Sequence, residues 1–443
     1  MRIFVFEMKS TKKLLLLILL SALLLRLLLL FIDTQPLRSD SLTYHQIALS
    51  ILSGEYTIEG RTTALVVPGY PIFLAGIYSL FGDGQFGVRL VQSFLDVLTC
   101  YLFFLVCRKF FDEKYSLIAL SVFAFFPSNA LYTQSVLTES LFGLFAMLVF
   151  LNVLRGSFDN RILLTGILFG AAILVRSSFS IAVLLIPLYL FIFKQQLFDS
   201  ISIIKPAINS LLFITGLIII LSPWMIRNKQ VMGAFTLATQ GGSTLWEGNN
   251  PQATGTWNKQ VADANVLFND PDEVGREKEF KKQAVEFILN NPVRFIELGF
   301  RKLGYLFSSE RMSLLYFMDS PAGMTSSQVY KTVNPLYMAV VNIPYFIVML
   351  AGAWGLLMPF RHKFFVVGFI SAWMITMFVF VAVPRYHYVL IPFFVIAAIN
   401  LLQRGLGSIT TLPLRSKLAG LVFTIFLLGV WISEFYLLYF RTV

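Results

Sequence analysis

Long runs of leucine, isoleucine, valine and phenylalanine decide what this chain can fold into. A helix that crosses a bilayer needs about 20 mostly apolar residues, and the first run, residues 14–32, already meets that need. Of the 443 residues, 57% are hydrophobic and only 13% are charged, whereas an ordinary soluble domain carries about 25% charged residues. A water-soluble globule is therefore excluded, and the sequence predicts an all-α polytopic membrane protein.

Short basic clusters between the apolar runs indicate the topology. Lys9, Lys12 and Lys13 precede the first run and place the N-terminus in the cytoplasm by the positive-inside rule. A net charge of +11 arranged in this way suits anionic lipid better than nucleic acid. The pattern predicts about eleven transmembrane helices, over residues 14–32, 86–107, 115–131, 141–154, 162–175, 181–193, 207–226, 336–358, 364–383, 388–402 and 418–439.

One further apolar run, residues 69–81, is too short to cross a bilayer and is bordered by Pro68 and Gly82. Counting it as a span inverts the charge pattern of every later turn, so we expect a helix that lies along the outer surface. A second surface helix is expected over residues 41–52, in the same outer loop. The chain then divides into an N-terminal transmembrane module (1–226) with a first outer loop (33–85), an extracytoplasmic loop (227–335) with amphipathic helices over 273–289 and 295–307, and C-terminal transmembrane helices (336–443).

No motif for a cofactor is present. The chain lacks the phosphate-binding GxxxxGK[ST] and GxGxxG patterns and the metal-binding HExxH and CxxC patterns. Its three histidines are scattered, which argues against a zinc site, and the acidic pair around Pro271 is better explained as a solvated turn. We expect no required cofactor and predict no metal ligand, although a divalent cation stays open. Cys100 and Cys107 lie about two helical turns apart and are expected to be core residues.

A few charged residues fall at the predicted outer ends of the spans, where charge is costly and often functional. Asp40 is either the N-cap of the helix that follows it or a general base. Glu139 either compensates a helix dipole or belongs to a site. Arg385 breaks the positive-inside pattern and needs an anionic partner. Arg176 either anchors the end of its span by snorkelling or belongs to a site, and Arg61 completes the candidates. Arg26, inside the first span, is expected to face a polar partner or to snorkel, and Arg227 to anchor the interface beside Trp224.

The order of several motifs resembles that of the polytopic GT-C glycosyltransferases, in particular the branch with the protein O-mannosyltransferases and the lipid A aminoarabinose transferase. The resemblance covers most of the chain. It is carried by Arg38-Ser39-Asp40 with Tyr44, Pro68-Gly69-Tyr70-Pro71, Leu137-Thr138-Glu139-Ser140, Pro223-Trp224 with Arg227-Asn228, Leu245-Trp246-Glu247-Gly248-Asn249-Asn250, and Pro384-Arg385-Tyr386.

The resemblance implies transfer of a sugar from a polyprenyl-phosphate donor to a hydroxyl or phosphate of a glycolipid, glycan or protein, on the extracytoplasmic face of a prokaryotic inner membrane. It implies that Asp40 is the catalytic base and that Glu139 is a second acidic site residue. A single direct displacement inverts the anomeric carbon. Donor-phosphate binding is assigned to Arg61, Arg176, Arg385 and Tyr386, and substrate binding to Tyr44, Tyr70, Trp246, Asn249 and Asn250.

A transporter or flippase of a lipid-linked sugar is the alternative, because it also has many spans and few charges. Its polar residues are expected near the middle of the membrane, on interrupted helices. Here the predicted acidic residues gather at one face, together with a loop of about a hundred residues. The sequence therefore favours the transferase.

Overall fold

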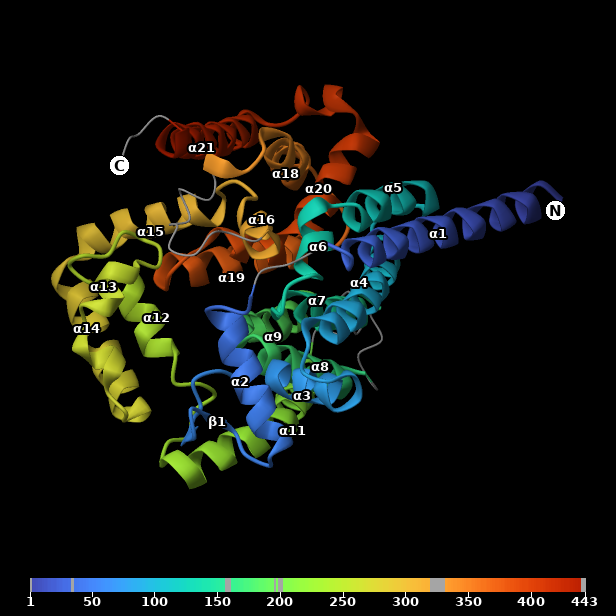
Figure 1. Cartoon of the computed structure of the whole chain (residues 1–443). Coiled ribbons are helices and arrows are strands. Elements are labelled where there is room, and N and C mark those ends of the chain that lie inside the picture. The colour runs from blue at the N-terminus through green and yellow to red at the C-terminus, as the bar shows by residue number, and fades with distance from the viewer. Residues whose placement is uncertain are drawn as a thin grey trace.

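The computed structural model is a helical bundle with one short β-hairpin (Figure 1), and it describes residues 2–32, 36–155, 161–194, 197, 202–318 and 331–439. The first half contains α1 (Arg2–Leu29), α2 (Asp40–Leu52), β1 (Thr57–Ile58), β2 (Arg61–Thr62), α3 (Gly69–Phe81), α4 (Gln85–Cys107), α5 (Glu113–Ala124), α6 (Pro127–Tyr132), α7 (Glu139–Leu154), α8 (Ile162–Val175), η1 (Ser177–Leu184), α9 (Leu185–Ile192) and α11 (Ile204–Met232).

The second half begins with short helices and ends with long ones. It contains α12 (Gly241–Gly248), α13 (Lys259–Asp263), η2 (Val266–Asn269), α14 (Glu273–Asn290), α15 (Pro292–Leu306), α16 (Met312–Phe317), α18 (Pro335–Leu357), α19 (Lys363–Val379), η3 (Pro384–Leu390), α20 (Ile391–Arg404), η4 (Leu406–Ile409) and α21 (Leu414–Tyr439). Residues 33–35 of the predicted first outer loop and residues 319–330 of the predicted extracytoplasmic loop lie outside the described residues.

The helical, polytopic class predicted from the sequence is confirmed. Within the described ranges, five helices are long and apolar enough to cross a membrane, and five shorter apolar helices accompany them. The predicted number of eleven spans stays a prediction. Three predicted runs are not single α-helices. The run 115–131 is divided by Pro127, which begins α6 after α5 has ended, and the runs 181–193 and 388–402 begin in the 3₁₀ helices η1 and η3.

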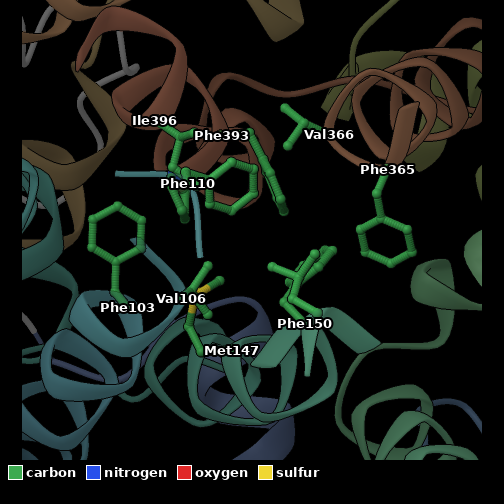
Figure 2. A pocket seen from close by; sticks show the side chains of 11 residues that line it. Phe103, Val106, Phe110, Met147, Phe150, Phe365, Val366, Phe393 and Ile396 are labelled. Atoms are coloured by element: carbon green, nitrogen blue, oxygen red, sulfur yellow. The ribbon is translucent and has the colours of Figure 1, made fainter. Parts of the chain in front are cut away.

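Aromatic side chains fill the centre of the bundle between α4, α7, α19 and α20. The ring of Phe150 meets those of Phe365, Phe369 and Phe393 edge-on, with centroids 5.2, 5.1 and 4.6 Å away. Figure 2 shows a cavity at this place, and all 11 of its lining residues are apolar. This cavity contains no side chain that can act as an acid or a base, so the chemistry of the protein must lie elsewhere.

Both helices predicted for the first loop are present, and their location on the outer surface stays a prediction. α2 and α3 pack against each other (Figure 1), and α3 has the predicted bounds. The first loop is joined to the second by Glu273, whose carboxylate accepts hydrogen bonds from Thr63 Oγ1 at 2.6 Å, Ala64 N at 3.1 Å and Thr239 Oγ1 at 2.8 Å. Nη1 of Arg227 donates a hydrogen bond of 2.7 Å to the Thr63 carbonyl, which joins the second loop to the first. The Arg227 guanidinium also lies beside the Trp224 ring, as predicted.

The second loop has a small core of its own. Trp246 of α12 packs against Phe268 and Phe280, with ring centroids 6.0 and 5.2 Å away, and α12, α13 and α14 form a separate group at the left of Figure 1. Asp272 caps α14 by accepting from two backbone N–H groups, which confirms the predicted turn around Pro271. This core holds α12 against α14.

Arg26 has the polar partner that the sequence predicted. Its guanidinium is fully buried and donates to Asp96 Oδ2 of α4 at 2.7 Å, and to the carbonyls of Ala22 and Ala124. Asp96 itself was not predicted. The free thiol of Cys100 lies nearby, and both cysteines are buried as expected.

Two glycines allow α8 and α11 to approach closely. A Cβ on Gly166 would lie 2.1 Å from the Phe213 carbonyl oxygen, and one on Gly216 2.3 Å from that of Leu163. Small residues at such crossings are typical of helix packing in membranes. Gly166→Leu is therefore expected to lower the melting temperature in detergent, with a loss of about 1–3 kcal/mol as for other overpacked interiors. Gly429→Leu, where a Cβ meets nothing within 4 Å, is the control, and equal melting of the two variants would contradict the prediction.

Candidate active site

Asp40 stands at the start of α2, where the chain turns sharply. Ser39 has a positive φ of 52° and occupies the N-cap position without a side-chain hydrogen bond. The Ser41 hydroxyl donates to the Arg38 carbonyl at 2.7 Å, which fixes the turn. Asp40 is thus the first helical residue and not the cap, and its carboxylate instead accepts from Nη2 of Arg385. The alternative that Asp40 is the N-cap of this helix is wrong, because Ser39 occupies that position.

Glu139 begins α7 and joins two arginines. Its Oε1 lies 3.3 Å from Nη2 of Arg176, at the end of α8, and 3.9 Å from Nε of Arg385. The carboxylate is buried, with a side-chain exposure of 1%. The start of a helix favours its negative charge, and the two guanidinium groups offset the cost of burying it.

Arg385 lies in η3, between α19 and α20. The indole of Trp373 donates to the Tyr386 carbonyl at 3.0 Å, which holds η3 against α19. Nη1 of Arg385 donates to the Tyr316 hydroxyl at 3.0 Å. The ring of Tyr386 stands 5.1 Å from the Arg176 guanidinium and 5.7 Å from that of Arg385, within the range of cation–π attraction.

These contacts form one cluster, Asp40, Glu139, Arg176, Arg385, Tyr316 and Tyr386, which we call the arginine cluster. Asp40 is its accessible acid, because its side chain is 32% exposed whereas that of Glu139 is 1% exposed. Burial acts to raise the pKa of Asp40, but the Arg385 guanidinium outweighs it and holds this pKa below its ordinary value. Asp40 is therefore ionised at neutral pH, and its carboxylate loses the charge only when the pH falls through this lowered pKa.

Comparison with known proteins identifies the fold. Residues 63–226 match the sequence model of the dolichyl-phosphate-mannose-protein mannosyltransferase family. The apo crystal structure of the Archaeoglobus fulgidus oligosaccharyltransferase is similar over 95% of this chain and 55% of that chain, with a TM-score of 0.50 and 12% identity. The chain has the fold of the GT-C glycosyltransferases. The fold implied by the motif resemblance is thereby confirmed.

A second solved GT-C structure, ArnT from Cupriavidus metallidurans bound to undecaprenyl phosphate, matches with a TM-score of 0.38 and 12% identity, over 89% of this chain and 78% of that one. No curated protein matches the sequence. This chain spans about half the length, 55%, of the archaeal oligosaccharyltransferase chain that it matches.

Some residues assigned to the site from the GT-C resemblance lie elsewhere. Arg61 is exposed on β2. Tyr70 is fully buried and donates to Gln92 at 2.9 Å. Trp246 belongs to the core of the second loop. None of the three belongs to the arginine cluster, and the binding roles that the resemblance implies for them stay predictions.

Asn249 and Asn250 are also structural. Asn249 donates to the carbonyls of Leu245 and Val379, and its oxygen accepts from the buried Lys302 at 2.9 Å. Asn250 donates to the Trp246 carbonyl at 2.9 Å. Both amides thus make hydrogen bonds inside the protein, and the substrate-binding role that the resemblance implies for them stays a prediction.

Tyr44 lies beside the arginine cluster as predicted, within electrostatic reach of Asp40 and Arg385. Burial raises its pKa above the ordinary value, so the phenol stays protonated. Its ring also rests edge-on against Tyr70 at 5.1 Å. Tyr44 is therefore placed both to support α3 and to donate a hydrogen bond at the site.

Sequence reasoning missed the residues that support η3 in this GT-C fold. His387 Nε2 contacts Oε2 of Glu310, and its Nδ1 lies 3.0 Å from the Leu306 carbonyl; both side chains are buried. The backbone N–H of Glu310 donates to Asn342 at 2.8 Å. His387 stands two residues after Arg385, a spacing that is the one available signal. Within the described residues no cluster of three metal-ligating side chains occurs.

Proposed function

We propose that this protein transfers a sugar from a polyprenyl-phosphate donor to an acceptor on the extracytoplasmic face, by a single inverting displacement. The observation that carries the proposal is the accessible Asp40 carboxylate held by Arg385 within the arginine cluster. The matched family supports the donor class, because its name contains a dolichyl-phosphate sugar. The acceptor is a glycolipid, glycan or protein, and the membrane is proposed to be the prokaryotic inner membrane, with the N-terminus in the cytoplasm.

The arginines match the leaving group. A departing polyprenyl phosphate is a weak base that carries negative charge, so its expulsion needs cationic stabilisation. Nη1 of Arg176 and Nε of Arg385 are buried donors without a hydrogen-bond partner among the described residues. These two guanidinium groups thus retain donor capacity for a phosphate, and we assign donor binding to them together with Tyr386.

The two acids differ in access and therefore in proposed role. Asp40 can reach a substrate, and we assign to it the role of the general base that takes the proton from the acceptor hydroxyl. A positioned carboxylate accelerates such a proton transfer about 100- to 10,000-fold. Glu139 is shielded and ion-paired with Arg176. We assign to Glu139 the orientation of the two arginines.

The lipid tail of the donor needs an apolar path. Arg176 rests 5.8 Å from the ring of Phe142, and Phe142 borders an apolar cavity that continues along α7 to Phe150. Apolar helices therefore begin directly beneath the arginine cluster. This arrangement explains why such a catalyst is embedded in a membrane.

The test is a transfer assay in detergent with the purified protein. A radiolabelled polyprenyl-phosphate sugar is mixed with a crude membrane acceptor fraction, and we expect label in the acceptor and release of polyprenyl phosphate. A flippase moves its lipid between leaflets and makes no new glycosidic bond. Translocation in vesicles without any transfer in detergent would favour that alternative and reject the transferase.

A further inference from the structure

Glu310 and His387 are buried ionisable side chains to which the proposed reaction assigns no role. The side chain of each is only 1% exposed. His387 belongs to η3, the 3₁₀ helix that also carries Arg385, and Glu310 lies in the segment between α15 and α16. Burying two such groups is costly unless they are paired, so their position two residues from a residue of the arginine cluster needs a physical reason.

The hydrogen bonds of this pair determine where its protons lie. His387 Nδ1 lies 3.0 Å from the Leu306 carbonyl oxygen, which can only accept, so a hydrogen is assigned to Nδ1. Nε2 contacts Oε2 of Glu310. Because two acceptors would repel each other at contact distance, these atoms share one proton. The pair as a whole is then neutral, and both nitrogens of the ring are tied to the end of α15 and the segment that follows it.

The geometry of η3 couples His387 to Arg385. A 3₁₀ helix has three residues per turn, so consecutive side chains point in directions about 120° apart. Arg385 points to Asp40 of α2, whereas His387 points to Glu310 on another side of η3. A rotation of η3 about its own axis that breaks the contact of His387 therefore also turns Arg385 away from Asp40.

The segment from Glu310 to Tyr316 contacts η3 at two points. Glu310 contacts His387, and the Tyr316 hydroxyl accepts from Nη1 of Arg385 at 3.0 Å. A single contact would act as a pivot, but two contacts on different sides of η3 fix its rotation. The backbone of Tyr316 is itself held, since the Ser135 hydroxyl donates to its carbonyl at 3.3 Å.

The segment that carries Glu310 is anchored to the C-terminal helices. Asn342 of α18 accepts from the Glu310 backbone N–H at 2.8 Å, and Glu434 of α21 accepts from the Ser309 backbone N–H at 2.7 Å. Through Glu310, α18 and α21 thus support η3. These groups all lie outside residues 63–226, which the mannosyltransferase family model matches, so that match gives them no role.

We propose that Glu310 and His387 are positioning residues that hold Arg385 in the orientation that binds the donor phosphate. This inference rests on the proposed function, which assigns donor binding to Arg176 and Arg385. A guanidinium group binds phosphate through N–H groups of fixed direction. A turn of η3 would direct the buried, unpartnered Nε of Arg385 away from the phosphate. Glu310 and His387 are too deeply buried to touch a substrate, so both act through Arg385.

The experiment measures the Kd of the purified protein for undecaprenyl phosphate in detergent and the acceptor KM in the transfer assay. The double variant Glu310→Leu with His387→Phe replaces the pair by apolar side chains of similar size and leaves no unpaired buried charge. We expect its Kd to rise about tenfold, as for one lost hydrogen bond between charged groups, while the acceptor KM changes less than about twofold. A purely structural loss would reduce the amount of active protein and leave the Kd of the folded molecules unchanged.

Glu310→Gln is the conservative variant. Its amide can donate to Nε2 of His387 while Nδ1 still donates to the Leu306 carbonyl, so the contact survives and the Kd should stay within about threefold of that of the unsubstituted protein. Arg26→Met with Asp96→Leu is the matched control, because it also removes a buried ion pair. Among the described residues that pair makes no hydrogen bond or ion pair with the arginine cluster, so the Kd of the control should be unchanged.

An unchanged Kd in the double variant, an equal rise of the acceptor KM, or an equally weakened Glu310→Gln would overturn this inference and leave the proposed function standing. If the double variant does not fold, a cryo-electron microscopy structure of the unsubstituted protein with undecaprenyl phosphate decides. Phosphate on Arg385, with His387 against Glu310, supports the inference, and phosphate bound away from Arg385 overturns it. Absence of both binding and transfer by the unsubstituted protein would overturn the proposed function and the inference with it.

Discussion

Asp40→Asn is expected to reduce sugar transfer about 100- to 10,000-fold, the range over which a positioned carboxylate acts as a base. Asparagine keeps the size of the side chain and can still accept a hydrogen bond from Arg385, but it cannot take a proton from the acceptor. The variant should therefore retain donor binding and lose turnover. Transfer from a radiolabelled polyprenyl-phosphate sugar, followed at saturating donor, measures the loss.

The control for this substitution is Glu55→Gln, which removes an exposed carboxylate from the same outer loop. It should leave turnover within about twofold, as expected for a surface change. Melting temperatures of both variants show whether the turn at Ser39 is intact. If Asp40→Asn folds and transfers at more than half the normal rate, Asp40 is not the base and the chemistry assigned to the arginine cluster fails.

The fold was largely predictable because membrane helices follow a strong rule. Apolar length and basic turns located the helices, and the run 69–81 predicted α3 with its observed bounds. The same reasoning placed Asp40, Glu139, Arg176 and Arg385 at one level, at helix ends. The structure brings these four together from α2, α7, the end of α8 and η3.

The partners within the site were not predictable, because they depend on how helices far apart in sequence are rotated. Arg61 looked equivalent to Arg176 in the sequence, yet the hairpin leaves it in solvent. Tyr316 has no distinguishing motif, and only the fold of α16 brings its hydroxyl to Arg385. A motif match also cannot tell a binding amide from a structural one, and the amides of Asn249 and Asn250 make hydrogen bonds inside the protein that the motif did not predict.

Asp96 shows a second limit of sequence reasoning. One acidic residue within the apolar stretch of α4 barely changes its mean hydropathy, so the run was read as a plain span. The helix nevertheless carries a buried charge at the place where Arg26 of α1 faces it. Arg26 was recognised as needing a partner, but nothing in the sequence indicated which helix supplied it.

This buried pair leads to the second large expected effect. Asp96→Leu alone should lower stability by about 3–5 kcal/mol, because it leaves the Arg26 charge unpaired in the interior. The double variant Arg26→Met with Asp96→Leu should be close to the parent, since well-packed apolar residues often replace a buried ion pair without loss. Thermal melting of the four proteins in detergent, treated as a double-mutant cycle, measures the coupling.

The same double variant also separates the two functions considered for this protein. In a transporter, a charged pair inside the spans is part of the path of the transported group, so removing it stops transport even when the fold survives. In the proposed transferase the pair joins α1 to α4 and, among the described residues, makes no hydrogen bond or ion pair with the arginine cluster, so the folded double variant should transfer sugar at the normal rate. A stable double variant without transfer would show that Arg26 and Asp96 have a role beyond holding helices together.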